Sequence, residues 1–386
     1  MTSSPTSIPL LERLVAFDTE SSRSNLDLID FVSDYLAGLG VEVSRHPNAA
    51  GDKAALLATV GPRAEGGVVL SGHTDCVPVA GQAWTGDPFR LRVEGGRAIG
   101  RGAVDMKGFD ALCLAAVPAM LKAGLKRPIH ICLSYDEETT CLGANDAIAR
   151  FGRDLPLPAA AIVGEPTELA AVDAHKSVAT FLTRVHGHEA HSAKPELGAS
   201  AVMAAAELMA ELNRIADEMV ARGDPSGRFD PSYTTVHVGQ VEGGNARNIL
   251  ARLCWFNWEF RGLPDLDPNE IPERFKAASE RVARDRLNRH GAYGRIETEW
   301  EILVPGLAPD PGSTAERLVL DLVGANATTT VPFGTEAGHF QAAGIPTIVC
   351  GPGSIDQAHQ ADEYIALDAL ADGEAFLGRL IARMAE

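Results

Sequence analysis

The order of apolar segments constrains the fold of this chain more than any other feature. Up to about residue 165, strand-like apolar runs alternate with segments whose apolar residues recur at helical spacing. The strand-like runs cover residues 54–60, 68–70, 129–133 and 159–163, and the helical segments cover residues 8–39 and 106–123. Strands that alternate with helices indicate an α/β sheet with a strong parallel component.

A different pattern interrupts this alternation after residue 176. Its expected order is strand, helix, strand, strand, helix, strand, which matches a ferredoxin-like unit. The strands are expected at 177–185, 233–241, 253–260 and 295–303, and the helices at 200–220 and 268–289. Beyond residue 305 the α/β pattern resumes, with a helix near 313–323 and a strand at 347–350. We therefore predict a discontinuous first domain, residues 1–176 and 305–386, and an inserted domain, residues 177–304.

Length and charge narrow the class of protein. A chain of 386 residues is too long for one ordinary hydrophobic core, so two domains are expected. Its formal net charge of -18 argues against nucleic acid and anionic membrane surfaces as partners, because both require a basic surface. We find no apolar stretch near the roughly 18 residues that a membrane span needs. The six cysteines are scattered, form no CxxC pair and fit a reduced, cytoplasmic protein.

One polar segment follows directly after the apolar run 68–70. Residues 72–78 read Gly-His-Thr-Asp-Cys-Val-Pro. Because side chains alternate along a strand, His73 and Asp75 can share one face. A metal-binding histidine is often oriented in this way, with one ring nitrogen on the metal and the other donating to an acid. Taken alone, the segment also fits a polar turn after a buried strand.

Four further polar clusters lie at turns or just after expected strands. They are Arg-Gly-Ala-Val-Asp-Met-Lys-Gly at 101–108, Tyr-Asp-Glu-Glu-Thr at 135–139, Gly-Glu-Pro-Thr at 164–167 and Gln-Ala-His at 357–359. Singly, each has an ordinary explanation, such as a helix N-cap, a solvated acidic face or a structural histidine. Together they supply two histidines and at least three carboxylates at the strand ends of one domain. Such a set could bind a pair of divalent ions, with zinc as the expected metal.

In their order and spacing, these motifs resemble those of the di-zinc aminoacylase and carboxypeptidase G-like metallohydrolase family. The resemblance covers essentially the whole chain. It implies a three-layer α/β catalytic domain of the di-zinc exopeptidase type, with an inserted ferredoxin-like α+β domain that acts as a lid and in dimerisation. It also implies two divalent ions, zinc or alternatively cobalt, and a homodimer formed through the inserted domain.

The resemblance implies a role for each metal-binding residue. His73 and Glu165 would bind one ion, Glu138 and His359 would bind the other, and Asp105 would bridge both. The three carboxylates leave one net positive charge on two divalent ions, which suits a bridging hydroxide.

Further roles concern catalysis. The resemblance implies that Asp75 orients His73 and that Glu137 is the general base, which passes the water proton to the leaving amine. His191, in an Ala-His-Ser motif, would donate to the tetrahedral oxyanion. The peptide bond between Asp105 and the next residue is expected to be cis.

Two candidates for substrate contact lie in the expected insertion. Asn248 falls where this family commonly has an asparagine in contact with the substrate backbone, although Ala251 replaces the usual proline of that motif. Arg261 could bind a substrate carboxylate through two hydrogen bonds, or could be an exposed arginine at a strand end. Whether His191 and Asn248 act within their own subunit or across a dimer stays open.

Two further candidates for substrate binding lie near the C-terminal end of the sequence and bear on which substrate is expected. Residues 333–338 read Phe-Gly-Thr-Glu-Ala-Gly and resemble the acetylornithine deacetylase branch of the family, which makes Thr335 and Glu336 substrate-binding candidates. An acid such as Glu336 would favour a substrate ammonium, or could simply pack at a helix N-terminus.

The expected reaction is therefore hydrolysis of an N-acyl amino acid. The first candidate is N2-acetyl-L-ornithine, cleaved to ornithine and acetate in arginine biosynthesis. The alternatives are a succinyl-diaminopimelate desuccinylase and another amidohydrolase or peptidase of the same family. A non-catalytic relative is disfavoured because Glu137 and Asp105 are both present, and residues 100–108 lack the glycine patterns of a nucleotide site.

Overall fold

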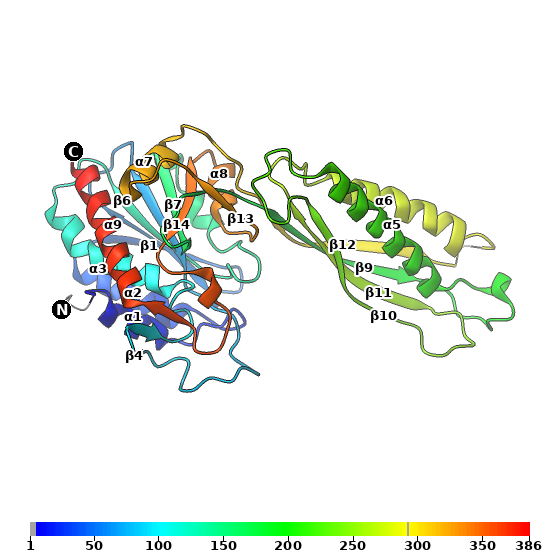
Figure 1. The fold of residues 1–386 in the computed structure, drawn as a ribbon. Helices are drawn as coiled ribbons and strands as arrows, with labels where there is room; N and C mark the ends of the chain where they lie inside the picture. The colour runs from blue at the N-terminus through cyan, green and yellow to red at the C-terminus, as the bar shows by residue number, and fades with distance from the viewer. Residues whose placement is uncertain (1–4, 292) are drawn as a thin grey trace. The chain divides into compact units, whose positions relative to one another are not determined.

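The computed structural model describes residues 5–291 and 293–386, so residues 1–4 of the predicted first domain lie outside the described residues. The chain divides into two units (Figure 1). Unit 1 comprises Met1–Ala174, Leu307–Thr330 and Thr335–Glu386, and unit 2 comprises His175–Gly306 and Val331–Gly334. The boundaries thus lie two residues from the predicted ones on each side, and a short segment near residue 331 joins unit 2.

A twisted sheet forms the centre of unit 1. Within the described residues it has eight strands in the order β1-β2-β6-β3-β7-β14-β8-β13. These are β1 (Glu42–Pro47), β2 (Ala54–Val60), β3 (Val68–His73), β6 (Ile129–Ser134), β7 (Ala160–Pro166), β8 (Val172–His175), β13 (Thr329–Val331) and β14 (Thr347–Gly351). Strands β6, β3, β7 and β14 run parallel to one another. They are apolar runs because both of their faces are covered.

Helices cover both faces of this sheet, which gives the predicted three layers. On β3, Ser71 bonds Glu336 at the start of α8, whereas Gly72 packs against Asp110 of α3. Neighbouring strand residues point to opposite faces, so α3 and α8 lie on opposite sides of the sheet. The helices are α1 (Ile8–Val15), α2 (Leu26–Gly38), α3 (Lys107–Lys122), α4 (Asn145–Ile148), α7 (Thr314–Val323), α8 (Ala337–Ala342) and α9 (Leu367–Ala385).

Unit 2 has the predicted ferredoxin-like order. Its elements are β9 (Ser177–His186), α5 (Ala201–Arg222), β10 (Thr235–Gly243), β11 (Leu253–Gly262), α6 (Glu270–Val282) and β12 (Arg295–Val304). The antiparallel sheet has the order β10-β11-β9-β12, and α5 and α6 lie on one of its faces (Figure 1). In the core, the rings of Phe181 and Trp258 stack with centroids 4.0 Å apart.

Several element ends differ from the sequence prediction. The helix expected over 268–289 ends at Val282 and continues as a π-helical turn, Ala283–Leu287. Three short strands that form a small separate sheet were not predicted: β4 (Arg92–Glu94), β5 (Arg97–Ile99) and β15 (Tyr364–Ala366). Strands of three residues are too short to show an alternating pattern. In the described part of the chain, no helix has the length and apolar character needed to cross a membrane.

Candidate active site

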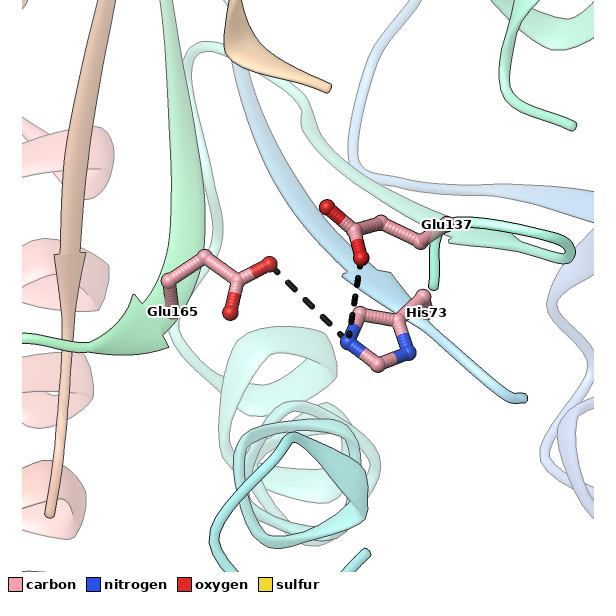
Figure 2. Close-up of side chains that lie close together, drawn as sticks. All are labelled: His73, Glu137 and Glu165. Carbon is pink, nitrogen blue, oxygen red and sulfur yellow. Dashed lines mark ion pairs between the residues drawn. The ribbon is translucent and has the colours of Figure 1, made fainter. Parts of the chain in front are cut away.

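The candidate metal-binding side chains meet at one edge of the large sheet. β3 ends at His73, β7 carries Glu165 near its end, and the turn after β6 carries Glu137 and Glu138. Asp105 lies in the turn before α3. Because the carboxyl ends of parallel strands meet at the same edge, the fold gathers residues that are far apart in the sequence. Figure 2 shows His73, Glu137 and Glu165 converging at this edge.

Asp105 lies between two histidines. Its Oδ1 is 3.0 Å from His73 Nε2, and its Oδ2 is 3.1 Å from His359 Nε2. His359 Nε2 also lies 3.0 Å from Glu138 Oε2. His73 Nε2 lies 3.9 Å from Glu165 Oε1 (Figure 2). One carboxylate that offers one oxygen to each histidine has the arrangement of a bridge between two ion positions. The structure therefore brings all five predicted metal ligands together.

The charge of the cluster fits divalent cations. Among the described residues, no lysine or arginine forms an ion pair with its carboxylates; their partners in ion pairs are the two histidines. Glu165 Oε1 is buried without a hydrogen-bond partner. Burial, followed by the charge of Glu137, raises the pKa of Glu165 well above its usual value. A buried carboxylate oxygen without a partner is an unfavourable arrangement that a bound cation would relieve.

The two histidines respond to the same surplus of negative charge. Hydrogen bonds with Asp105 and Glu138 raise the pKa of His359 to about 10. Burial alone would lower the pKa of His73, but its hydrogen bond with Asp105 and the nearby acids raise it well above the usual value. The raised pKa of each residue favours a proton at a position where an ion could bind instead.

Asp75 lies beside His73 and also holds the turn that carries two glutamates. His73 Nδ1 lies 3.0 Å from the backbone oxygen of Asp75 but 3.6 Å from its carboxylate, so the ring is oriented by the carbonyl. The carboxylate instead accepts the N–H groups of Glu137 at 3.1 Å and Glu138 at 3.3 Å, and the hydroxyl of Ser21 at 2.7 Å. Because the ring N–H is already satisfied, Asp75 is free to hold the turn that presents the two glutamates.

Comparison with known proteins bears on this cluster. The sequence profile of peptidase family M20/M25/M40 matches residues 69–383. The chain belongs to this family. Acetylornithine deacetylase from Myxococcus xanthus is 36% identical over 378 residues, which cover 96% of each chain. Acetylornithine deacetylase from Pasteurella multocida is 33% identical over 387 residues, 98% of each chain.

A solved structure supports the same fold. Aminopeptidase PepT from Bacillus cereus superposes with a TM-score of 0.75, over 99% of this chain and 98% of that chain, at 20% sequence identity. The family profile and the relatives identify this M20/M25/M40 protein as a metal-dependent amidohydrolase. The peptide bond between Asp105 and Met106 is cis, as the family resemblance predicts.

Thr335 and Glu336 of this M20/M25/M40 chain are both buried at the start of α8, which fits the alternative role predicted for Glu336, packing at a helix N-terminus. Glu336 is 1% exposed, and its Oε1 accepts the Ser71 hydroxyl at 2.5 Å. Its Oε2 is buried without a partner, and burial raises its pKa. Thr335 is also fully buried, and its hydroxyl accepts the N–H of Ala337 at 3.0 Å. An enclosed carboxylate that accepts the Ser71 hydroxyl favours this packing role over contact with a substrate ammonium.

The three candidates from the insertion all lie in unit 2. His191 forms an isolated antiparallel bridge with Ile249, and the Ser192 N–H donates to the Asn248 oxygen at 3.0 Å. The exposed side chains of His191 and Asn248 thus come from paired segments. Arg261 Nη2 lies 3.3 Å from Glu259 Oε2. A partly exposed ion pair of this kind is weak, so a substrate carboxylate could compete for the guanidinium.

Sequence reasoning missed several residues that hold the site. Ser21 bonds Asp75, Gln82 bonds the backbone of His359, and Glu363 bonds the backbone of Asp105. None belongs to a motif with recognisable spacing. The sequence offered one signal: Glu363 is an acid only four positions after His359. In the structure, its side chain is 1% exposed.

Proposed function

We propose that this chain hydrolyses the amide bond of N2-acetyl-L-ornithine and releases ornithine and acetate, a step of arginine biosynthesis. The observation that carries the proposal is the cluster in which Asp105 joins two histidines, with Glu137 beside it. The nearly full-length similarity to acetylornithine deacetylases supports the choice of substrate.

The cluster would hold two divalent ions, with zinc expected and cobalt as the alternative. His73 and Glu165 would bind one ion, Glu138 and His359 the other, and Asp105 would be shared. When bound, the ions would polarise the scissile carbonyl and make water easier to deprotonate. Hydrogen-bonded or buried positions hold all five side chains in place, so the ligands are arranged before an ion binds.

Glu137 would move the proton. Its Oε2 lies 3.9 Å from His73 Nε2, and its backbone N–H is held by Asp75. Burial raises the pKa of Glu137 well above its usual value, and the neighbouring Glu138 and Asp105 add to the effect. A carboxyl group with a raised pKa can accept a proton from water and then give it to the departing amine. His191 would donate to the oxyanion and Asn248 would contact the substrate backbone.

A substrate panel tests the proposed function. Zinc-loaded and cobalt-loaded protein is assayed with N2-acetylornithine, N-acetylmethionine, succinyl-diaminopimelate and a dipeptide. We expect kcat/KM to be highest for N2-acetylornithine. A higher kcat/KM for succinyl-diaminopimelate or for the dipeptide would contradict the proposed substrate and favour the corresponding alternative.

We also propose a homodimer formed through unit 2. Among the described residues, nine of the thirteen large hydrophobic side chains that are exposed lie in this unit, including Met203 at 66% and Val241 at 54%. Exposed apolar groups gathered in one unit are typical of an interface. We expect Met203→Asp to shift the mass measured by light scattering toward the monomer, and Val93→Asp, an exposed apolar site in unit 1, to leave it unchanged. A dimer in both variants would argue against a contact at Met203.

Net charge and the state of the cysteines support two further proposals, on nucleic acid as a partner and on the location of the protein. A net charge of -18 does not favour nucleic acid as a partner. All six cysteines are free and buried, which fits a reducing, cytoplasmic location.

A further inference from the structure

Arg101 and Glu363 form a buried ion pair beside the metal-ligand cluster. Arg101 Nη1 lies 2.7 Å from Glu363 Oε2, and each side chain is 1% exposed. Removing two charges from water costs free energy that their attraction offsets only when further hydrogen bonds satisfy the remaining polar atoms. In this protein, those further hydrogen bonds involve both Glu363 oxygens and both terminal nitrogens of Arg101, whereas Arg101 Nε has no partner among the described residues, and they reach two of the predicted metal ligands.

The second oxygen of Glu363 holds the backbone at Asp105. Glu363 Oε1 accepts the N–H of Val104 at 3.0 Å and the N–H of Asp105 at 3.2 Å. Both N–H groups lie in the turn that presents the Asp105 side chain. Because two donors converge on one buried carboxylate oxygen, Glu363 fixes where that side chain begins.

The second terminal nitrogen of Arg101, Nη2, is connected to the backbone of His359 through Gln82. Arg101 Nη2 donates to Gln82 Oε1, and Gln82 Nε2 donates to the backbone oxygen of His359 at 2.8 Å. The Trp84 indole N–H also donates to Gln82 Oε1, at 3.1 Å, which fixes the orientation of the amide. His359 has a φ of 62°, in the left-handed region that a residue other than glycine adopts only when its surroundings hold it there.

These contacts close a ring. The side chains of Asp105 and His359 meet at 3.1 Å, and their main chains are connected through Glu363, Arg101 and Gln82. We call these last three residues the positioning network. Since the network acts on backbone groups, it sets where the two side chains start without competing for their ligand atoms.

We propose that the positioning network presets the ion position that contains His359, through the contact of Gln82 with the His359 backbone, whereas its hold on Asp105 serves both positions. In the described residues, its hydrogen bonds include none to His73 or Glu165, which form the other ion position. The proposal rests on the two-ion site of the proposed function. It adds that His359 has a supporting contact of its own, so the ion position that contains His359 can be weakened alone.

Gln82→Leu tests the proposal. It removes the hydrogen bond to His359 and leaves the Arg101–Glu363 pair in place. Chelator-treated full-length protein is titrated with Co²⁺ and followed by visible absorption and calorimetry. Loss of a group that supports a metal ligand typically weakens binding about 10- to 100-fold. We expect one of the two binding steps to weaken at least about tenfold, with the other step unchanged.

Two further variants separate positioning from general stability. Gln341→Leu is the matched control, because Gln341 also exchanges two backbone hydrogen bonds, with Ala308 at 2.8 and 2.9 Å, but lies outside the site. We expect it to bind both ions as the wild type does. Gln82→Glu keeps an oxygen for Arg101 and loses the donor to His359, so it should show the same selective loss as Gln82→Leu.

Three results would overturn the proposal. These are unchanged binding steps in Gln82→Leu, equal weakening of both steps, and wild-type binding in Gln82→Glu. The readout is ion binding, so it does not depend on the substrate. A wild-type protein that binds two ions but fails to cleave N2-acetylornithine would refute the proposed substrate and leave this inference standing.

Discussion

At the scale of single residues, Asp75 joins the two glutamates to the rest of the site. Its carboxylate accepts the N–H groups of Glu137 and Glu138 and the hydroxyl of Ser21. Asp75→Asn replaces one acceptor oxygen with an amide NH2 group, which would then face an N–H group of the turn from which it cannot accept a hydrogen bond. We expect kcat to fall about 10- to 100-fold, with a smaller change in KM, because the catalytic groups are displaced while substrate contacts remain.

Steady-state kinetics at equal metal content measures this effect. Ser21→Ala is the control, because it removes one donor and leaves both carboxylate oxygens for the turn. It should lower kcat less than Asp75→Asn does. A kcat of Asp75→Asn equal to that of the wild type would show that the turn does not depend on this carboxylate.

At the scale of elements, close packing between β7 and α3 sets the position of Glu165. A Cβ on Gly164 would overlap the ring of Phe109 in α3, so only glycine fits beside the glutamate. We expect Gly164→Ala to lower the free energy of unfolding by about 1–3 kcal/mol, because the ring must move within a packed core. Urea denaturation of the metal-free protein measures the change.

The matched control lies in a solvent-facing part of α9. A Cβ on Gly378 would meet no other atom within 4 Å, so alanine fits there without a clash. Gly378→Ala should raise stability by up to about 1 kcal/mol, since alanine favours the helix. Equal stabilities of the two variants would refute the packing argument at Gly164.

The element order of unit 2 and the alternation of strands and helices in unit 1 were predictable from the sequence, and so was the convergence of His73 and Glu165. Both residues follow apolar runs, and parallel strands deliver their ends to one edge. The contacts of Arg101 were not predictable, because its partner Glu363 lies 262 positions away and one sequence carries no pairing signal. The two predicted roles of Glu336 could not be separated for a related reason: its polar partner Ser71 lies in an apolar strand 265 positions away.

At the scale of the whole molecule, the metal-free protein should lose stability as the pH rises. The raised pKa of Glu165 means that, above its ordinary value of 4.5, the folded state binds a proton that the unfolded chain releases. The raised pKa of His359 contributes stability that is complete below 6.5 and is lost as the pH rises toward about 10. Between about pH 6.5 and pH 10, the raised pKa values of Glu165 and His359 therefore both make the folded state less stable as the pH rises.

Thermal unfolding with and without chelator measures this dependence. We expect the Tm of the chelated protein to fall between about pH 6 and pH 9. The Tm of the metal-loaded protein should fall less over the same range, since bound ions take the place of the protons. Asp105 does not change this fall of stability with pH. Burial raises its pKa, but its two histidine partners lower it by more, so the stability that Asp105 contributes is lost only in acid. A Tm of the chelated protein that rises over this range would contradict the charge distribution described for the cluster.

The proposed hydrolysis depends on Glu137 as the group that moves the proton in a site that retains its metal ions. The most direct test compares the hydrolysis of N2-acetylornithine by the wild type and by Glu137→Gln, with metal content measured on the same samples. General acid–base groups typically contribute about 10²- to 10⁴-fold, so we predict a fall in kcat of at least about 100-fold with both ions retained. Turnover by Glu137→Gln equal to that of the wild type, at equal metal content, would contradict the account.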